Sequence, residues 1–595
     1  MRTTIRQVMT LIGPGRGRRW LGLVALAGLV SVVEASGALL VYALLQLVTQ
    51  DEGSLDVPVI GDIGSHFPGL DERQLLLSVA LVIAVFFVAR AGLYLTQSYL
   101  QSRVAYNTGV AVSSRLLRGY LASTYPEHLR RSSAESLRNA HESAQLLAQQ
   151  VLVPGVALVS ESFLLLVVFL VLLVVAPGVT GLTVLVLAPL SVLLVKGLQP
   201  RLMRFGQTAQ DMSTASLDAL TQTLGGFREV KVLHRESFFT QRFDLTRAML
   251  ARAFYLRSFL LDVPRVGVET GLILFILVFL AINVGEDGAS DGTVTTLAFF
   301  AYAALRVLPS VNRIMVNLQL IRFGMPLISQ LHADVSAADA AVSGASSAAP
   351  IERWPFERSI VLDRVTVVYD GADRPALAEI DLEIRRGEWV GIVGPTGGGK
   401  STLVDVMIGL LPPTTGSIRV DGRDVFADPR SWHAHLGLVP QTIFLVDDTI
   451  RRNIAFGIPD EEISDEAIET AVRMARIDEW IASLPNGLDT PVGERGVKVS
   501  GGQRQRVAIA RALYTDPDVI VFDEGTSALD TTTESEVIQA LQGLRGGRTL
   551  VTVAHRLSTV RTCDRVVAVA GGRIVASGTY DELDLDALQT PTSNP

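Results

Sequence analysis

The sequence lacks several features that would point to other classes of protein. It has one cysteine among 595 residues, Cys563, so no disulfide can form within the chain. It also lacks an excess of positive charge, because 52 lysine and arginine residues against 60 aspartate and glutamate residues give a formal net charge of -8 at pH 7. That balance does not suggest a nucleic-acid-binding surface, and we expect no nucleic-acid partner.

The N-terminus is basic but shows no small-residue cleavage site, and the apolar run behind it is too long for the core of a signal peptide. Ile5, Val8, Met9 and Ile12 fall on one face of a helix. We therefore expect a short amphipathic helix on the membrane surface before the first span.

Long apolar runs fill the first half of the chain, and the mean hydropathy of +0.36 supports a membrane domain. Six runs are each long enough to cross about 30 Å of hydrocarbon. They lie at residues 20–49, 75–104, 149–176, 179–199, 259–284 and 293–318. Arginine is frequent before the first run and after the second and fourth, whereas the connections after the first and fifth are acidic. The positive-inside rule then predicts a multi-pass protein of the cytoplasmic membrane with both termini and the C-terminal half in the cytoplasm.

The connections after the second and fourth spans are long and helical in character, so we expect the spanning helices to extend into the cytoplasm. The predicted turning points are residues 125–135 and 224–236. An Ala/Ser-rich, non-periodic stretch, "ADVSAADAAVSGASSAAP", follows the last span. It predicts a linker at 331–357 between a transmembrane domain at 1–330 and a soluble domain at 358–595.

The stretch "GEWVGIVGPTGGGKSTLVDVMIGLL" reads as an apolar strand, a glycine-rich loop and an apolar helix. Its loop fits the phosphate-binding pattern G-x-x-x-x-G-K-[ST] in the required context. The alternative is a glycine-rich turn that holds no nucleotide. We expect Lys400 to reach the β- and γ-phosphates of ATP and the Ser401 hydroxyl to ligate Mg²⁺. The predicted nucleotide-binding residues here are Gly394, Pro395, Thr396, Gly397, Gly398, Gly399, Lys400, Ser401 and Thr402.

A second apolar strand, "DVIVFDEGTSALD", ends in two acidic residues. Asp523 is positioned to hold Mg²⁺ through water, and Glu524 to polarise the attacking water. The alternative for such an acidic pair is a helix N-cap.

The stretch "KVSGGQRQRVAIARAL" resembles the signature motif of ATP-binding-cassette (ABC) proteins. With the six spans, the chain resembles an ABC exporter half-transporter of the type IV exporter fold over nearly its whole length. The resemblance implies a multidomain protein, an all-α six-helix transmembrane domain followed by an α/β P-loop nucleotide-binding domain. It also implies that Ser500, Gly501, Gly502 and Gln503 cap the γ-phosphate of the nucleotide bound by a partner subunit. Val499 replaces the usual leading leucine at a packing position.

Other roles come from the same resemblance. Tyr369 would stack on adenine, although a core aromatic is the alternative. Gln441 would contact Mg²⁺ and sense the membrane domain, Asp530 would cross the dimer interface, and His555 would contact the γ-phosphate. Because Glu524, Gln441, His555 and the signature glycines are all present, a homodimer with two competent sites is favoured over a heterodimer.

Arginines interrupt three predicted spans, where a charge is costly unless it is paired or faces water. Arg265 has Glu269 on its own helical face, whereas Arg90 and Arg306 would need Glu34 or Glu161 from another helix. The competing hypothesis is a cationic cavity for an anionic head group, since the arginine fork suits phosphate.

Parts of the membrane half resemble PglK-type flippases for lipid-linked oligosaccharides. That resemblance implies a role for Arg90, Arg265 and Arg306 in binding a substrate pyrophosphate. The predicted function is an ATP-driven flippase for a lipid-linked, pyrophosphate-bearing oligosaccharide or related lipid. The alternatives are an exporter of drug-like compounds, peptides or ordinary lipids, an ATP-gated channel, and an importer with the exporter fold.

Overall fold

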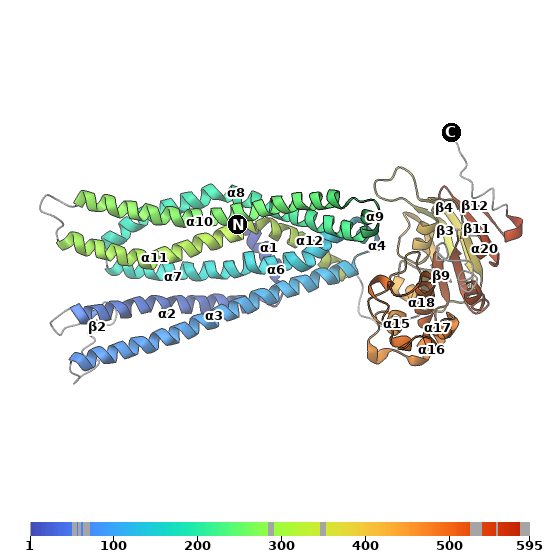
Figure 1. Ribbon diagram of the computed structural model, residues 1–595, viewed down its shortest axis with the longest axis horizontal. Coiled ribbons are helices and arrows are strands. Elements are labelled where there is room, and N and C mark those ends of the chain that lie inside the picture. Colours follow the sequence, from blue (N-terminus) through green and yellow to red (C-terminus); the bar gives the residue numbers. More distant parts are fainter. Residues whose placement is uncertain are drawn as a thin grey trace. The chain divides into compact units, whose positions relative to one another are not determined.

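The computed structural model describes the chain in nine stretches: residues 2–49, 56–57, 61–62, 72–175, 177–283, 291–344, 353–523, 538–554 and 557–583. The chain divides into two compact units, Met1–Ser346 and Ser347–Pro595. Each unit is described by itself below (Figure 1).

The first unit is a bundle of long helices, and each predicted span lies on a different one. These are α2 (Gly17–Thr49), α3 (Glu72–Ala122), α7 (Val153–Val175), α8 (Pro177–Gly225), α10 (Glu236–Asn283) and α11 (Asp291–Phe323). Figure 1 shows α7, α8, α10 and α11 gathered together, with α2 and α3 running beside them. At 1.5 Å per residue, the 51, 49 and 48 residues of α3, α8 and α10 reach roughly 70–77 Å, far more than a bilayer core requires. The spanning helices therefore extend beyond the membrane, as the helical character of the connections predicts.

Among the described residues, two helical segments are long and apolar enough to cross a membrane, Leu77–Ala122 and Ser133–Leu170. A third candidate is the pair Val307–Phe323 and Met325–Gly344, which bends by 47° at its break. Each of the other three predicted spans, at 20–49, 179–199 and 259–284, contains side chains outside the described part.

Both predicted turning points contain short helices. At the first lie α4 (Tyr125–Arg130) and the start of α5 (Ser133–Arg138), and at the second lies α9 (Phe227–Val232). Between α5 and α7 the chain alternates α6 (Ala144–Leu147) with two π-helical turns, η2 (Asn139–Ser143) and η3 (Ala148–Leu152). Two strands of two residues each, β1 (Asp56–Val57) and β2 (Gly61–Asp62), pair antiparallel between α2 and α3.

The N-terminal segment forms the predicted helix, α1 (Arg2–Ile12). Its apolar residues divide between two environments, because Leu11 and Ile12 are buried whereas Ile5 and Met9 are exposed. The guanidinium of Arg115 on α3 donates hydrogen bonds to the carbonyl oxygens of Thr10 and Leu11, at 3.2 and 3.0 Å. These bonds satisfy carbonyls that the end of a helix leaves free.

The predicted linker is wrong at its start, because helix α12 (Met325–Gly344) continues through it. Leu331, Val335 and Ala338 are buried at helical spacing. A Cβ at Gly119 of α3 would lie 2.0 Å from the Cβ of Ala338, so the two helices cross closely. The stretch from residue 333 is rich in alanine, a strong helix former, and between residues 333 and 344 only Val335 and Ala338 are buried, so the sequence shows little apolar periodicity there.

The second unit contains two sheets. A six-stranded sheet has the order β12-β11-β5-β10-β9-β8, with β12 alone antiparallel to its neighbour. Its strands are β5 (Trp389–Val393), β8 (Leu436–Val439), β9 (Val519–Asp523), β10 (Thr549–Val553), β11 (Arg565–Ala570) and β12 (Arg573–Gly578). An antiparallel sheet joins β4 (Leu377–Arg385), β3 (Ser359–Val367), β6 (Thr415–Val420) and β7 (Arg423–Asp424) in that order.

The two faces of the parallel sheet pack on different partners because strand side chains alternate. Val390 and Ile392 of β5 belong to a core shared with the antiparallel sheet and with α13 (Lys400–Met407). Trp389 and Val393 belong to a second core with α16 (Asp465–Met474) and α18 (Gly501–Tyr514). Other helices of the unit include α14 (Pro429–His433), α15 (Ile450–Ile454), α17 (Asp478–Ala482) and α20 (Leu557–Val560). Two buried layers thus fix β5 and the loop that follows it.

Candidate nucleotide site and membrane pocket

The glycine-rich loop joins the fully buried β5 to α13, and its path requires glycine. Gly394 has φ +147°, and a Cβ there would lie 1.9 Å from the carbonyl oxygen of Val569. Gly399 has φ +106°, and its Cβ would lie 2.7 Å from the carbonyl oxygen of Ala376. Any side chain at these positions would displace the loop from the neighbouring backbone. The backbone N–H groups at the start of α13 are consequently held where a phosphate can approach them.

The side chain of Lys400 packs inside this loop. Its side chain is buried, with the residue 5% exposed, and its Nζ donates to the carbonyl oxygens of Gly394 (2.9 Å) and Pro395 (3.1 Å). Ser401 follows in the first turn of α13 and is exposed. The loop therefore presents a positive charge, the N-terminal end of a helix and a free hydroxyl position together, a set that fits a nucleotide phosphate.

Tyr369 lies beside the loop, just after β3. Its hydroxyl is 3.2 Å from Oγ1 of Thr402, and the residue is 39% exposed. The structure thus places this ring at the loop rather than in the core, where an adenine could contact it.

Gln441 and Asp523 follow neighbouring parallel strands. Strand β8 pairs with β9, with Val439 opposite Phe522, so Asp523 ends β9 close to the point where β8 leaves the sheet. Gln441 comes two residues after β8 and is exposed. The carboxyl ends of parallel strands share one edge, which is also where the loop leaves β5.

Asp405 on α13 is a site residue that the sequence analysis missed. Burial, together with the negative charge of Asp523, raises the pKa of Asp405 to about 6. The carboxylate of Asp523 therefore lies near the helix that follows the phosphate loop.

The signature segment begins α18. The Ser500 Oγ accepts a hydrogen bond from the Gln503 backbone N–H at 3.2 Å, and the Gln503 side chain accepts one from the Ser500 N–H at 2.9 Å. This capping box fixes the first turn. Gly501 is exposed to solvent, whereas Gly502 is buried. The N-terminus of α18 is thus a rigid, exposed end of a 14-residue helix with no acidic residue in its first turn.

Three predicted site residues lie outside the described part of the chain: Glu524, Asp530 and His555. The water-polarising, interface-crossing and γ-phosphate roles assigned to them remain predictions.

Two of the three predicted membrane arginines, Arg90 and Arg265, form ion pairs in the structure. Arg90 on α3 forms an ion pair with Glu34 on α2 and lies over the Phe87 ring, 5.4 Å from its centre. Arg265 on α10 pairs with Glu269 one turn later, with 3.0 Å between Nε and Oε1. The side chain of Arg306 lies outside the described residues.

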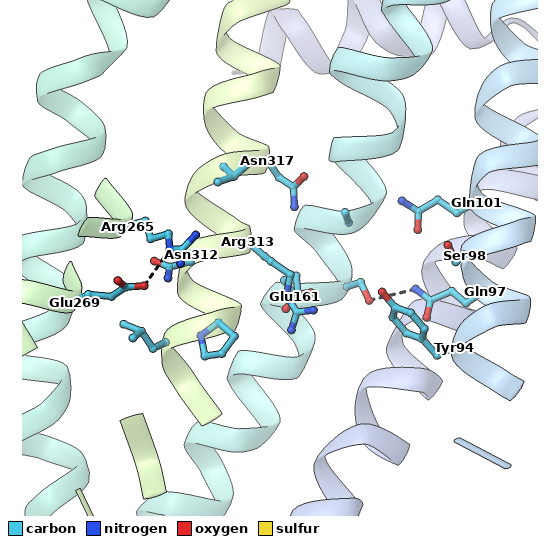
Figure 2. A pocket seen from close by; sticks show the side chains of 15 residues that line it. Tyr94, Gln97, Ser98, Gln101, Glu161, Arg265, Glu269, Asn312, Arg313 and Asn317 are labelled. Atoms are coloured by element: carbon cyan, nitrogen blue, oxygen red, sulfur yellow. Dashed lines mark hydrogen bonds and ion pairs between the residues drawn. The ribbon is translucent and has the colours of Figure 1, made fainter. Parts of the chain in front are cut away.

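A pocket of about 630 Å³ opens between α3, α7, α10 and α11. Figure 2 shows Arg265 and Glu269 on one side and the α3 residues Tyr94, Gln97, Ser98 and Gln101 on the other. The pocket includes Arg265 but not Arg90, so these two predicted arginines do not line it together. It instead adds Arg313, which the sequence analysis overlooked and whose Nε lies 2.9 Å from Oε1 of Glu161. Only a partner on a distant helix could have identified Arg313, and sequence spacing does not report such a partner.

The chain matches two family models, one in each compact unit. The model described as ABC transporter matches residues 377–527, and the model described as ABC transporter transmembrane region matches residues 24–307.

Curated relatives are similar along most of the chain. An ATP-dependent lipid A-core flippase of Ralstonia nicotianae is 31% identical over 574 residues, which cover 93% of this chain and 93% of that protein. A protein of the same name from Thiobacillus denitrificans is 35% identical over 407 residues, covering 68% and 69% of the two chains. Among solved structures, a bacterial Atm1-family ABC exporter with ATP bound matches with a TM-score of 0.76 and 24% identity, over 96% of this chain and 97% of that one. That likeness shows the exporter fold.

Proposed function

This chain belongs to the ABC transporter family and is a membrane ATPase coupled to transport; we propose that it is a flippase that moves a glycan-bearing lipid across the cytoplasmic membrane. The proposed substrate is a lipid-linked oligosaccharide or a related glycolipid. The observation that carries the proposal is the similarity to lipid A-core flippases over 93% of both chains, which includes the membrane unit as well as the ATP-binding one. The polar pocket among apolar helices supports it, since a lipid head group needs a polar path through the bilayer.

The nucleotide chemistry follows from the site's residues. Tyr369 would contact adenine, while the loop backbone and Lys400 hold the phosphates. Ser401, Gln441 and Asp523 would hold Mg²⁺, which offsets phosphate charge when bound. Glu524 would orient the attacking water, and His555 would contact the γ-phosphate.

One chain carries one phosphate loop and one signature segment, so we propose a homodimer with two composite sites. Each would be completed by the partner's signature segment, including its exposed helix end, and by Asp530. ATP binding would bring the two ATP-binding units together, and hydrolysis would release them. The long helices beyond the membrane would carry this closure to the spans, with both termini in the cytoplasm.

The experiment reconstitutes the full-length protein in liposomes with a fluorophore-labelled glycolipid and follows its protection from a membrane-impermeant quencher. ATP should move the lipid in wild type, and Lys400→Ala and Glu524→Gln should each abolish that movement. Arg573→Ala on β12, which removes an exposed ion pair with Glu379 on β4, serves as the control and should transport normally.

Two results would contradict the flippase. Lipid movement that persists with ATP in Glu524→Gln would indicate an ATP-gated channel, because gating needs binding without turnover. A wild type that hydrolyses ATP and moves a drug-like dye, but no lipid, would indicate an exporter of small compounds.

A further inference from the structure

A second pocket of the membrane unit, which we call the α1 pocket, lies where the loop after α1 meets α3 and α12. Its volume is about 380 Å³, and it shares no lining residue with the pocket of Figure 2. Three of its lining side chains are charged: Arg16, Arg115 and Asp339. Their charges sum to +1, whereas the two arginines and two glutamates of the other pocket cancel.

The guanidinium of Arg115 is already held by the protein. Its Nε and Nη2 donate to the two carboxylate oxygens of Asp339, at 3.3 and 2.5 Å. Its Nη1 donates to the carbonyl oxygens of Thr10 and Leu11. This arginine therefore ties α1 to α3 and α12, and Arg16 carries the remaining charge of the α1 pocket.

Arg16 is partly exposed, and within the described part of the chain its side chain forms no ion pair or hydrogen bond. Arg18 and Arg19 follow in the first turn of α2 and are exposed. The sequence contains no aspartate or glutamate before Glu34. A guanidinium without a carboxylate partner binds two phosphate oxygens through its planar fork, so the α1 pocket suits a phosphate group.

The surroundings of the α1 pocket match the surface of a membrane. On α1, Ile5 and Met9 are 56% and 53% exposed one turn apart, and the neighbouring Arg6 is exposed as well. An exposed apolar face edged by arginine lies favourably among anionic lipid head groups. Helix α2 begins at Gly17, and the first predicted span begins at residue 20. The loop between α1 and α2 is therefore at the level where the chain enters the bilayer.

We propose that the α1 pocket binds the phosphate of an anionic phospholipid through Arg16, while the exposed face of α1 rests on the surrounding head groups. The lipid belongs to the leaflet that α1 faces, which is the cytoplasmic leaflet in the proposed orientation. This site is separate from the pocket between the spans. The inference goes beyond the proposed function, because it holds whatever the protein transports.

The bound lipid would act on the helix that leads to the ATP-binding unit. Leu11 and Ile12 of α1 belong to one buried cluster with Ile328 and Leu331 of α12. Helix α12 ends at Gly344, just before the second unit begins. A lipid that holds the loop after α1 in place therefore stabilises the packing of α1 on α12.

Trp20 is a natural reporter for this site. It follows the arginines at the start of α2, and the other four tryptophans of the chain lie in the second unit. The full-length protein is placed in phosphatidylcholine nanodiscs with increasing fractions of phosphatidylglycerol whose acyl chains carry bromine, which quenches nearby tryptophan. Brominated phosphatidylcholine at the same fractions gives the baseline. We expect excess quenching by the anionic lipid in wild type, and Arg16→Gln should need about fivefold more of it for half the effect.

Two further variants test the contact itself. Arg103→Gln removes the same charge from an exposed position of α3 near the end of the second predicted span, outside the α1 pocket, and should match wild type. Arg16→Lys keeps the charge but not the fork and should lie between wild type and Arg16→Gln.

Three outcomes would overturn the inference. Equal quenching by the two brominated lipids in wild type would show that no anionic lipid is selected. Equal shifts in Arg103→Gln and Arg16→Gln would assign the attraction to general surface charge. Loss of the excess quenching on addition of inorganic phosphate, at constant ionic strength, would show that the α1 pocket takes free phosphate. Transport and ATP hydrolysis are not part of this measurement, so its failure would leave the proposed function standing.

Discussion

The nucleotide site and the membrane pocket are built from different parts of the polypeptide. The nucleotide site is made largely of backbone: a short loop whose glycines hold positive φ, followed at once by the end of a helix. The membrane pocket is made of side chains from four helices that are far apart in the sequence. The nucleotide site binds phosphate through backbone groups, which substitutions change little. The membrane pocket binds through side chains, so a few substitutions can change its ligand.

Charge is also handled differently in the two regions. The ammonium of Lys400 donates to backbone carbonyls of the loop, which places its positive charge within the phosphate-binding loop. In the membrane unit Arg90, Arg265 and Arg313 each have a carboxylate partner. These three arginines are thus each paired with a carboxylate of the protein, whereas Lys400 lies among backbone groups of the phosphate loop.

The largest expected effect comes from filling the loop. Gly394→Ala places a Cβ 1.9 Å from the Val569 carbonyl oxygen and should displace the loop from β11. We expect ATP affinity to fall by about 100-fold or more, which is about 2.7 kcal/mol, measured with a fluorescent ATP analogue. Glycolipid binding in the membrane pocket should be unaffected.

Gly397→Ala is the matched control for this substitution. Gly397 also has positive φ, +78°, but nothing lies within 4 Å of its Cβ position. The Gly397→Ala variant should lose only about 1 kcal/mol of ATP-binding free energy, the modest cost of a non-glycine residue with a left-handed backbone. If both substitutions lower ATP affinity equally, backbone strain and not the close approach to Val569 determines the conformation of the loop. The contrast with the pocket would then lose its basis.

This difference in construction explains how far the sequence predicted each region. A phosphate loop is a contiguous pattern, so Gly394, Lys400 and Ser401 were identified directly. The six long helices were also predictable, because each apolar run reports its own length. The pairing of Arg313 with Glu161 was not, because it depends on how α7 and α11 pack.

Two other differences have local causes. Helix α12 was taken for a linker because its second half buries only Val335 and Ala338 among many alanine and serine residues, which carry little hydrophobic signal. Asp405 was missed because its role depends on the neighbouring end of β9, which is remote in sequence.

The next effect concerns the pairing of Arg90 with Glu34. Arg90→Met should lower the stability of the membrane unit by about 2–4 kcal/mol, because it leaves a partly buried carboxylate without its partner. The double variant Arg90→Met with Glu34→Gln should regain much of that loss. Thermal unfolding of the detergent-solubilised protein measures both. The relative stimulation by glycolipid should persist in the folded double variant, since Arg90 does not line the pocket.

The opposite pattern would break the comparison of the two regions. A double variant of normal stability that no longer responds to glycolipid would make Arg90 a ligand. The membrane unit would then, like the nucleotide site, hold a cation for the substrate.

The smallest effect is a pH dependence at the nucleotide site. The pKa of Asp405 is raised from 3.8 to about 6 by burial and by Asp523, so the folded chain favours the neutral carboxyl. This stabilisation is complete below pH 4, where both states are protonated, and is lost as pH rises through 6. In chelator-treated protein, Asp405→Asn should be more stable than wild type by about 1–2 kcal/mol at pH 7.5, after allowance for solvent screening. The difference should vanish near pH 4, with unfolding followed by tryptophan fluorescence.

Asp428→Asn provides a control of opposite sign in the same unit. Asp428 precedes α14. The hydrogen bond from the Ser431 side chain is the main cause that holds the pKa of Asp428 below its ordinary value. Its charged form stabilises the folded chain above the unfolded pKa, and that stabilisation is lost as pH falls through the folded pKa. Asparagine keeps the cap but not the charge. Asp428→Asn should therefore be the less stable variant at neutral pH, and equal to wild type in acid. If both variants shift in the same direction at pH 7.5, general charge repulsion in the unit, and not the pairing of Asp405 with Asp523, sets the pH dependence.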